Sequence, residues 1–125
     1  MKYHIEVIKS ARYCYINAIS NENHTRIGKV CIDLDAEDSN RYKNHNNKAA
    51  KIILVQTNQS VCGQGIATAL LNKTIEEFKG YNLYLSVIPL RSDKTKDDLI
   101  RFYSKFGFKK YNNDIITTMI KKWLI

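Results

Sequence analysis

Two glycines near the middle of the chain, Gly63 and Gly65, lie between a strand-like apolar run and a helical pattern. The N-terminus of a helix presents backbone N–H groups that have no partner inside the helix, together with the positive end of the helix dipole. Such an end binds an anion such as phosphate without a charged side chain, and glycine lets the anion approach the backbone closely. Residues 62–68 therefore predict a binding site for a phosphorylated ligand.

Three kinds of phosphate-binding loop place glycines in this way. A P-loop requires Lys followed by Ser or Thr after its last glycine, whereas Ile66 and Ala67 follow Gly65. A dinucleotide-binding fingerprint requires a third Gly or Ala where this chain has Thr68, and it usually lies near the start of its domain. The third interpretation, a pyrophosphate loop for coenzyme A, depends on the family resemblance described below.

The first half of the chain predicts four β-strands, because alternating and β-branched residues occupy positions 3–9, 13–19, 27–34 and 52–57. The fourth of these segments has a nearly continuous apolar run, which favours a strand that is buried on both faces. Residues 35–48, which precede it, are rich in Asn, Asp, Ser and Lys, and we expect them to form an exposed loop.

The second half of the chain predicts two helices with strands between and after them. Apolar residues at helical spacing indicate an amphipathic helix over residues 65–79, with Gly80 at its end. Thr95 and Asp98 are spaced as in a capping box that opens a second helix, which Gly107 ends. We expect further strands at 83–88, 108–111 and 115–122. The fold class is therefore a mixed α/β sheet domain in the order β-β-β-β-α-β-α-β-β.

The composition is that of a globular protein of one domain. The chain has 125 residues, 44% of them hydrophobic and 26% charged, and we expect residues 1–125 to form a single domain. Its aliphatic runs are too short to cross a bilayer, and its N-terminus is too charged for a signal peptide. Cys14, Cys31 and Cys62 form no CxxC pair, so we expect no disulfide framework, no metal site and a cytoplasmic location.

The net charge of +8 indicates a polyanionic partner without identifying it. Nucleic acid, an anionic membrane surface and a small phosphorylated cofactor all suit a basic protein, and lysine also serves simply to keep a protein soluble. The charge therefore gains meaning only from the loop at residues 62–68, which favours the small cofactor.

Two motifs resemble those of the GCN5-related N-acetyltransferase (GNAT) family. The segment Cys62-Gly63-Gln64-Gly65-Ile66-Ala67 resembles its acetyl-CoA-binding motif, Gln/Arg-x-x-Gly-x-Gly/Ala, with Gly65 and Ala67 at the two small-residue positions. Residues 99–109 resemble the family's helix that ends in Phe-Tyr-x-Lys-x-Gly-Phe. The resemblance covers residues 55–108 and implies a GNAT-like acyltransferase fold in which the strands at 52–57 and 83–88 are parallel and splay apart.

The resemblance also implies a function and a set of site residues. It implies an acetyl-CoA-dependent N-acetyltransferase in which a primary amine attacks the thioester directly. The backbone of Val55, Gln56 and Thr57 is expected to hold the pantetheine arm, with an N–H near Thr57 polarising the thioester carbonyl. Tyr103 occupies the place of the family's general acid, although a core aromatic role on its helix is the alternative. The residues implied to hold the pyrophosphate are Cys62, Gly63, Gln64, Gly65, Ile66, Ala67 and Thr68.

The chain departs from the family pattern at several positions. Cys62 stands where Gln or Arg is usual, and it is either a small loop residue or a thiol activated by the helix terminus. Lys96 replaces an Asn that often contacts the cofactor, and Lys51 lies where several relatives have a catalytic Glu. The general base stays open among Glu6, Asp33, a histidine and a chain of water molecules. The short connection at residues 9–12 leaves no room for the two helices that wall the acceptor pocket in relatives.

The acceptor is not specified by these motifs. The resemblance implies a small-molecule or peptide amine, and the basic charge also suits an amine carried by RNA. We expect no membrane partner, and a homodimer stays open. The alternative is a non-catalytic module of the same fold that uses its basic surface for nucleic acid or a protein partner, and salt-dependent nucleic-acid binding without acetyl-CoA affinity would distinguish it.

Overall fold

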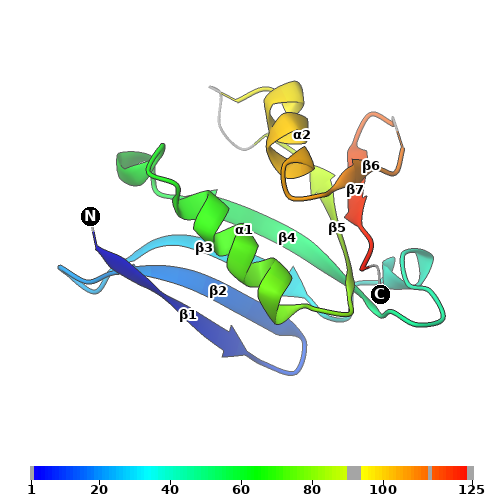
Figure 1. The fold of residues 1–125 in the computed structure, drawn as a ribbon, viewed down its shortest axis with the longest axis horizontal. Helices are drawn as coiled ribbons and strands as arrows, with labels where there is room; N and C mark the ends of the chain where they lie inside the picture. The colour runs from blue at the N-terminus through cyan, green and yellow to red at the C-terminus, as the bar shows by residue number, and fades with distance from the viewer. Residues whose placement is uncertain (1, 90–93, 113, 124–125) are drawn as a thin grey trace.

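The computed structural model describes residues 2–89, 94–112 and 114–123, and these form one seven-stranded sheet with two α-helices (Figure 1). The strands are β1 (Tyr3–Lys9), β2 (Tyr13–Ser20), β3 (Arg26–Asp33), β4 (Ala49–Thr57), β5 (Asn82–Val87), β6 (Lys109–Lys110) and β7 (Thr117–Lys121). The helices are α1 (Ile66–Glu77) and α2 (Lys96–Ser104), with two short 3-10 helices, η1 (Ser39–Arg41) and η2 (Gln59–Val61). The expected class and order of elements are confirmed, and Asn113, in the expected final turn, lies outside the described residues.

The sheet has the order β1-β2-β3-β4-β5-β7-β6 and is antiparallel except at its centre. Strands β4 and β5 run parallel, because the chain returns from the end of one to the start of the other through α1. Such a crossover is the connection that a parallel pair requires. The carboxyl ends of β4 and β5 therefore lie at the same edge of the sheet, next to the N-terminus of α1.

Helix α1 packs against one face of the sheet through the apolar stripe expected from its sequence. Its residues Ile66, Leu70 and Leu71 are at most 2% exposed and belong to the main core. Opposite them on β3 is Gly28, where an added Cβ would lie 3.1 Å from side-chain atoms of both Ile66 and Leu70. The absence of a side chain at Gly28 thus lets the start of α1 approach the sheet closely.

Helix α2 begins at the expected capping box. The Thr95 hydroxyl accepts a hydrogen bond from the Asp98 N–H at 3.1 Å, and the Asp98 carboxylate accepts one from the Thr95 N–H at 3.0 Å. These two bonds satisfy N–H groups that a helix terminus otherwise leaves unpaired. The apolar face of α2 places Tyr103 in the core, with Phe102 and Phe106 packed at its border.

The expectation that β4 is buried on both faces is wrong. Ile53 is 46% exposed and Gln56 is also exposed, while Ile52 is buried in the same core as the apolar residues of α1. The cause is the short connection between β1 and β2, which contains no helix, so that no α-helix of the described residues covers the sheet face opposite α1 (Figure 1).

The expectation of a wholly exposed loop at residues 35–48 is also wrong. Tyr42 in this loop is 5% exposed and its ring stacks on Tyr84 of β5 with 4.0 Å between centroids. The buried Asn82 donates a hydrogen bond from Nδ2 to the Tyr42 carbonyl at 2.9 Å, and its Oδ1 accepts from Asn47 Nδ2 at 3.2 Å. The loop is thus fastened to the face of β5 that carries Tyr84, and Tyr42 is its buried aromatic contact.

Neither α-helix within the described ranges is long and apolar enough to cross a membrane.

Candidate functional site

The two central strands part before they end. Strands β4 and β5 pair from Ala49 with Asn82 to Ile52 with Leu85, yet β4 continues to Thr57. At the same place β4 carries a bulge, because Cys31 and Ile32 of β3 pair with Leu54 and Ile52 and leave Ile53 between them. A bulge bends its strand and increases the local twist, which directs β4 away from β5. The expected gap between the two strands is therefore confirmed.

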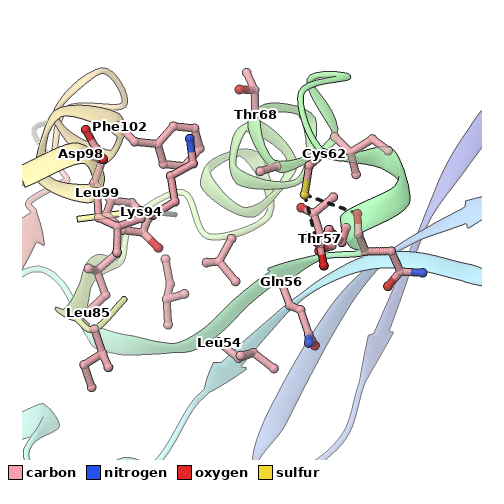
Figure 2. Close-up of a pocket in the computed structure, with 18 of the residues that line it drawn as sticks. Leu54, Gln56, Thr57, Cys62, Thr68, Leu85, Lys94, Asp98, Leu99 and Phe102 are labelled. Carbon is pink, nitrogen blue, oxygen red and sulfur yellow. Dashed lines mark hydrogen bonds between the residues drawn. The ribbon is translucent and has the colours of Figure 1, made fainter. Parts of the chain in front are cut away.

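A cavity of about 1140 Å³ occupies this gap. Figure 2 shows its two walls: Thr57, Cys62 and Thr68 lie on the side of β4 and α1, while Asp98, Leu99 and Phe102 of α2 lie on the other. Its lining includes most of the residues that the sequence assigned to the cofactor and to acid catalysis, namely Val55, Gln56, Thr57, Cys62, Gly63, Gly65, Ile66, Ala67, Thr68 and Tyr103. Gln64 is exposed and does not line the cavity.

The loop before α1 has the geometry of an anion site. Gly63 and Gly65 have φ angles of +83° and +77°, and a Cβ added at either would meet nothing within 4 Å. Gly65 is the N-cap of α1, no side chain caps this terminus, and its first turn contains no acidic residue. The N–H groups at the start of α1 thus have no partner inside the helix, and this terminus lines the cavity, so the loop suits a pyrophosphate.

The free edge of β4 suits an extended arm that carries amides. One edge of β4 pairs with β3 as far as Thr57 with Gly28, whereas the other edge loses its partner strand after Ile52. Backbone N–H and C=O groups on such an edge are available to a ligand that adds itself like a strand. Val55, Gln56 and Thr57 lie on this segment, between the bulge and the anion loop.

Cys62 contributes to the shape of the anion loop. Its thiol lies 3.4 Å from the carbonyl oxygen of Asn58 and 4.0 Å from that of Thr57 (Figure 2). These contacts fasten the loop to the end of β4. They favour the interpretation of Cys62 as a small loop residue over that of a nucleophile.

Tyr103 enters the cavity from α2. The residue is 9% exposed and packs edge to face against Phe102 and Phe108, at 5.4 and 6.0 Å between ring centroids. Burial raises the pKa of Tyr103 to about 12. The phenol therefore keeps its proton throughout the neutral range and serves as a hydrogen-bond donor, while its packing also gives it a place in the core.

The charged residues of the lining are Lys51, Lys94 and Asp98 within the part of the chain that the structure describes. Asp98 belongs to the capping box of α2 and forms an ion pair with Arg101. Lys96 is absent from the lining and instead donates hydrogen bonds to the carbonyl oxygens of Asp114 and Ile115, at 3.4 and 3.3 Å. Lys96 thus links α2 to the segment before β7.

None of the side chains that the sequence offered as a general base, namely Glu6, Asp33 or a histidine, belongs to the described lining of the cavity. Glu6 is on the edge strand β1, hydrogen-bonded to His4 at 3.1 Å. Asp33 forms a two-point ion pair with Arg12, with both N···O distances 3.2 Å. Burial by itself would raise the pKa of Asp33, but the hydrogen bonds from Arg12 and the Asp35 N–H outweigh it and lower the pKa.

A carboxylate that sequence reasoning missed lies beside the cavity. Asp38, in the loop before η1, accepts a hydrogen bond from the Tyr84 hydroxyl at 2.6 Å and pairs with Lys51 Nζ at 3.5 Å. Burial acts to raise the pKa of Asp38, but these two partners outweigh it and lower the pKa. The sequence offered no direct signal, because the loop reaches Lys51 through contacts between distant residues, such as the stacking of Tyr42 on Tyr84 and the hydrogen bond from Asn82 to Tyr42.

No cluster of three or more His, Cys, Asp or Glu residues suited to a metal ion occurs in residues 2–89, 94–112 and 114–123. Cys14 and Cys31 are buried free cysteines.

Comparisons with known proteins agree with this geometry. A family model described as the acetyltransferase (GNAT) family matches residues 2–108. A structure of the PaiA N-acetyltransferase from Thermoplasma acidophilum with coenzyme A superposes with a TM-score of 0.65 at 19% identity, over 90% of this chain and 62% of that one. NAA60 of Arabidopsis thaliana with a bisubstrate analogue gives 0.64 at 18% identity, over 89% and 75%.

A complex of KacTA with DNA gives a TM-score of 0.64 at 13% identity, over 90% of this chain and 69% of that one. These likenesses show the fold. A search of curated proteins found no match. The chain spans about three fifths to three quarters of these structures' lengths.

Proposed function

Since this chain belongs to the acetyltransferase (GNAT) family, we propose that it transfers an acetyl group from acetyl-CoA to a primary amine. The observation that carries the proposal is the cavity where β4 and β5 part, which ends at the uncapped, glycine-bounded start of α1. A strand edge and an anion-binding helix terminus in one continuous cavity match the two parts of coenzyme A, its amide-bearing arm and its pyrophosphate.

In this proposal the backbone does most of the binding. The pyrophosphate accepts hydrogen bonds from N–H groups of residues 63–68, aided by the helix dipole. The free edge of β4 at Val55, Gln56 and Thr57 aligns the pantetheine arm, and an N–H near Thr57 polarises the thioester carbonyl. Gln64 contributes its N–H alone, because its side chain lies outside the cavity.

Acetyl-CoA supplies an acetyl group activated as a thioester. A neutral primary amine forms the new C–N bond to the acetyl carbonyl, the C–S bond breaks, and the amine's extra proton leaves through solvent. Tyr103 donates a hydrogen bond to the sulfur as it gains negative charge. Because its pKa of about 12 lies above the thiol value of about 8.5, Tyr103 acts chiefly by stabilising the thiolate rather than by surrendering its proton.

The acceptor approaches from the sheet face opposite α1, where the loop carrying Asp38 lies beside the cavity. We infer an acceptor that is a small-molecule or peptide amine, with an RNA-borne amine as a further member of the same class. The open face places few steric limits on size, because the connection between β1 and β2 is a short turn.

The test is release of free thiol from acetyl-CoA in the presence of amines, short peptides and aminoacyl-tRNA. We expect saturable turnover with at least one amine, with the acetyl group recovered on that amine by mass spectrometry. Nucleic-acid binding without affinity for acetyl-CoA would contradict the proposal and would support a non-catalytic module of the same fold. Parallel titrations with acetyl-CoA and with single-stranded RNA separate these two results.

A further inference from the structure

Lys51 places a primary amine in the wall of the cofactor cavity. It lies on β4 opposite Tyr84 of β5, one residue before the last pair, Ile52 with Leu85, after which the strands part. Its side chain is 28% exposed and it belongs to the cavity lining. The amine therefore lies where the gap between the strands begins, on the side of the sheet that carries Tyr84 and the Asp38 loop.

The position of this amine is fixed by its neighbours. Lys51 Nζ lies 3.5 Å from Asp38 Oδ2 and 6.0 Å from the centre of the Tyr84 ring. Asp38 is itself held by the Tyr84 hydroxyl at 2.6 Å, and the Tyr42 ring stacks on the Tyr84 ring with 4.0 Å between centroids. A lysine held in this way loses little further freedom on reaching a reactive arrangement, which is the main advantage of an intramolecular reaction.

We propose that Lys51 is a self-acetylation site, modified by the acetyl-CoA that the cavity binds, and this inference rests on the proposed function. The Lys51 ammonium gives a proton to water, which reaches it because the side chain is 28% exposed. The neutral amine then attacks the thioester carbonyl, a C–N amide bond forms, and the C–S bond breaks. Coenzyme A leaves as the thiol once it has taken up a proton, so no oxidant or further reactant is required.

The modification changes the mouth of the cavity. An acetylated Lys51 is neutral, so it no longer pairs with Asp38 and no longer adds a positive charge beside an anionic cofactor. Asp38 keeps its bond from Tyr84 and becomes available to an incoming ammonium group. Self-acetylation thus removes the ion pair between Lys51 and Asp38, and the Asp38 carboxylate can then pair with the ammonium group of an acceptor.

The experiment incubates the full chain with isotope-labelled acetyl-CoA and quantifies acetylation of each lysine by peptide mass spectrometry. We expect the rate at Lys51 to saturate with acetyl-CoA, to be independent of protein concentration, and to exceed that at Lys29 about tenfold or more. Lys29 is the matched reference, because it is also half-buried, lies on the neighbouring strand β3 and is absent from the cavity lining.

Two variants distinguish the loss of an acetylation site at residue 51 from the loss of its positive charge. Lys51→Arg keeps a cation beside Asp38 but offers no amine, so the saturable label should disappear. Lys29→Arg should leave it unchanged. Calorimetric titration of the same samples with acetyl-CoA reports cofactor binding independently of the label.

Three results would overturn the inference. If acetyl-CoA binds and Lys51 stays unmodified at saturation, self-acetylation is excluded while the proposed function stands. Equal, non-saturating labelling of Lys51 and Lys29 would show only chemical acetylation in solution. If acetyl-CoA does not bind at all, the proposed function fails and self-acetylation fails with it.

Discussion

Replacing Gly65 by valine should weaken acetyl-CoA binding by about 30-fold or more, which corresponds to about 2 kcal/mol. Gly65 has a φ of +77°, so valine there has a strained backbone. A Cβ added at Gly65 meets nothing within 4 Å, so the valine side chain occupies open space at the α1 terminus that the pyrophosphate would use. Charge-assisted hydrogen bonds to a phosphate are each worth about 1.5–3 kcal/mol, so displacing the pyrophosphate from one or two N–H groups accounts for the loss. Calorimetric titration measures the affinity.

Gly80→Val is the matched control for this substitution. Gly80 has a φ of +88°, an added Cβ there also meets nothing within 4 Å, and it lies beyond the opposite end of α1. Both variants should lose a similar amount of stability, about 1–3 kcal/mol for a residue forced into this backbone region, measured by chemical denaturation. Only Gly65→Val should lose affinity. Equal affinities of the two variants would show that the start of α1 does not bind the pyrophosphate.

Tyr103→Phe should lower turnover about ten- to a hundredfold while acetyl-CoA affinity changes little. The substitution removes one hydroxyl and keeps the aromatic packing against Phe102 and Phe108. A hydrogen bond to a charged group contributes about 1.5–3 kcal/mol, and here it forms only as the sulfur becomes negative. The measurement is steady-state thiol release with the best amine, together with calorimetric affinity.

Tyr81→Phe is the control for Tyr103→Phe. Tyr81 packs against Phe78 beyond the end of α1, at 5.2 Å between ring centroids, and does not line the cavity. It should retain wild-type turnover. If Tyr103→Phe also retains full turnover, Tyr103 is a core aromatic only, and the leaving thiolate is stabilised by another group.

The cofactor half of the site could be predicted from the sequence because its signals are local. The glycines before α1, the apolar stripe that begins at Ile66 and the capping box of Thr95 and Asp98 each specify a conformation within a few residues. The order of these elements along the chain then places β4 next to β5. The gap between those strands was also expected, and the structure adds its physical cause, a bulge at Ile53.

The acceptor half depends on contacts between distant segments, which local patterns do not encode. The loop at 35–48 is polar, yet Tyr42 and Asn82 fasten it to the sheet and bring Asp38 to Lys51. Continuous hydrophobicity in β4 suggested burial on both faces, but exposure there is decided by whether another segment covers the strand. The short turn between β1 and β2 leaves that face open.

The most direct test of the account is a crystal structure of this chain with coenzyme A. We expect the pantetheine arm in the gap that opens after Ile52 of β4 and Leu85 of β5, with the pyrophosphate hydrogen-bonded to backbone N–H groups of residues 63–68. Coenzyme A bound on another surface, or β4 and β5 paired along their full length with no gap between them, would contradict it.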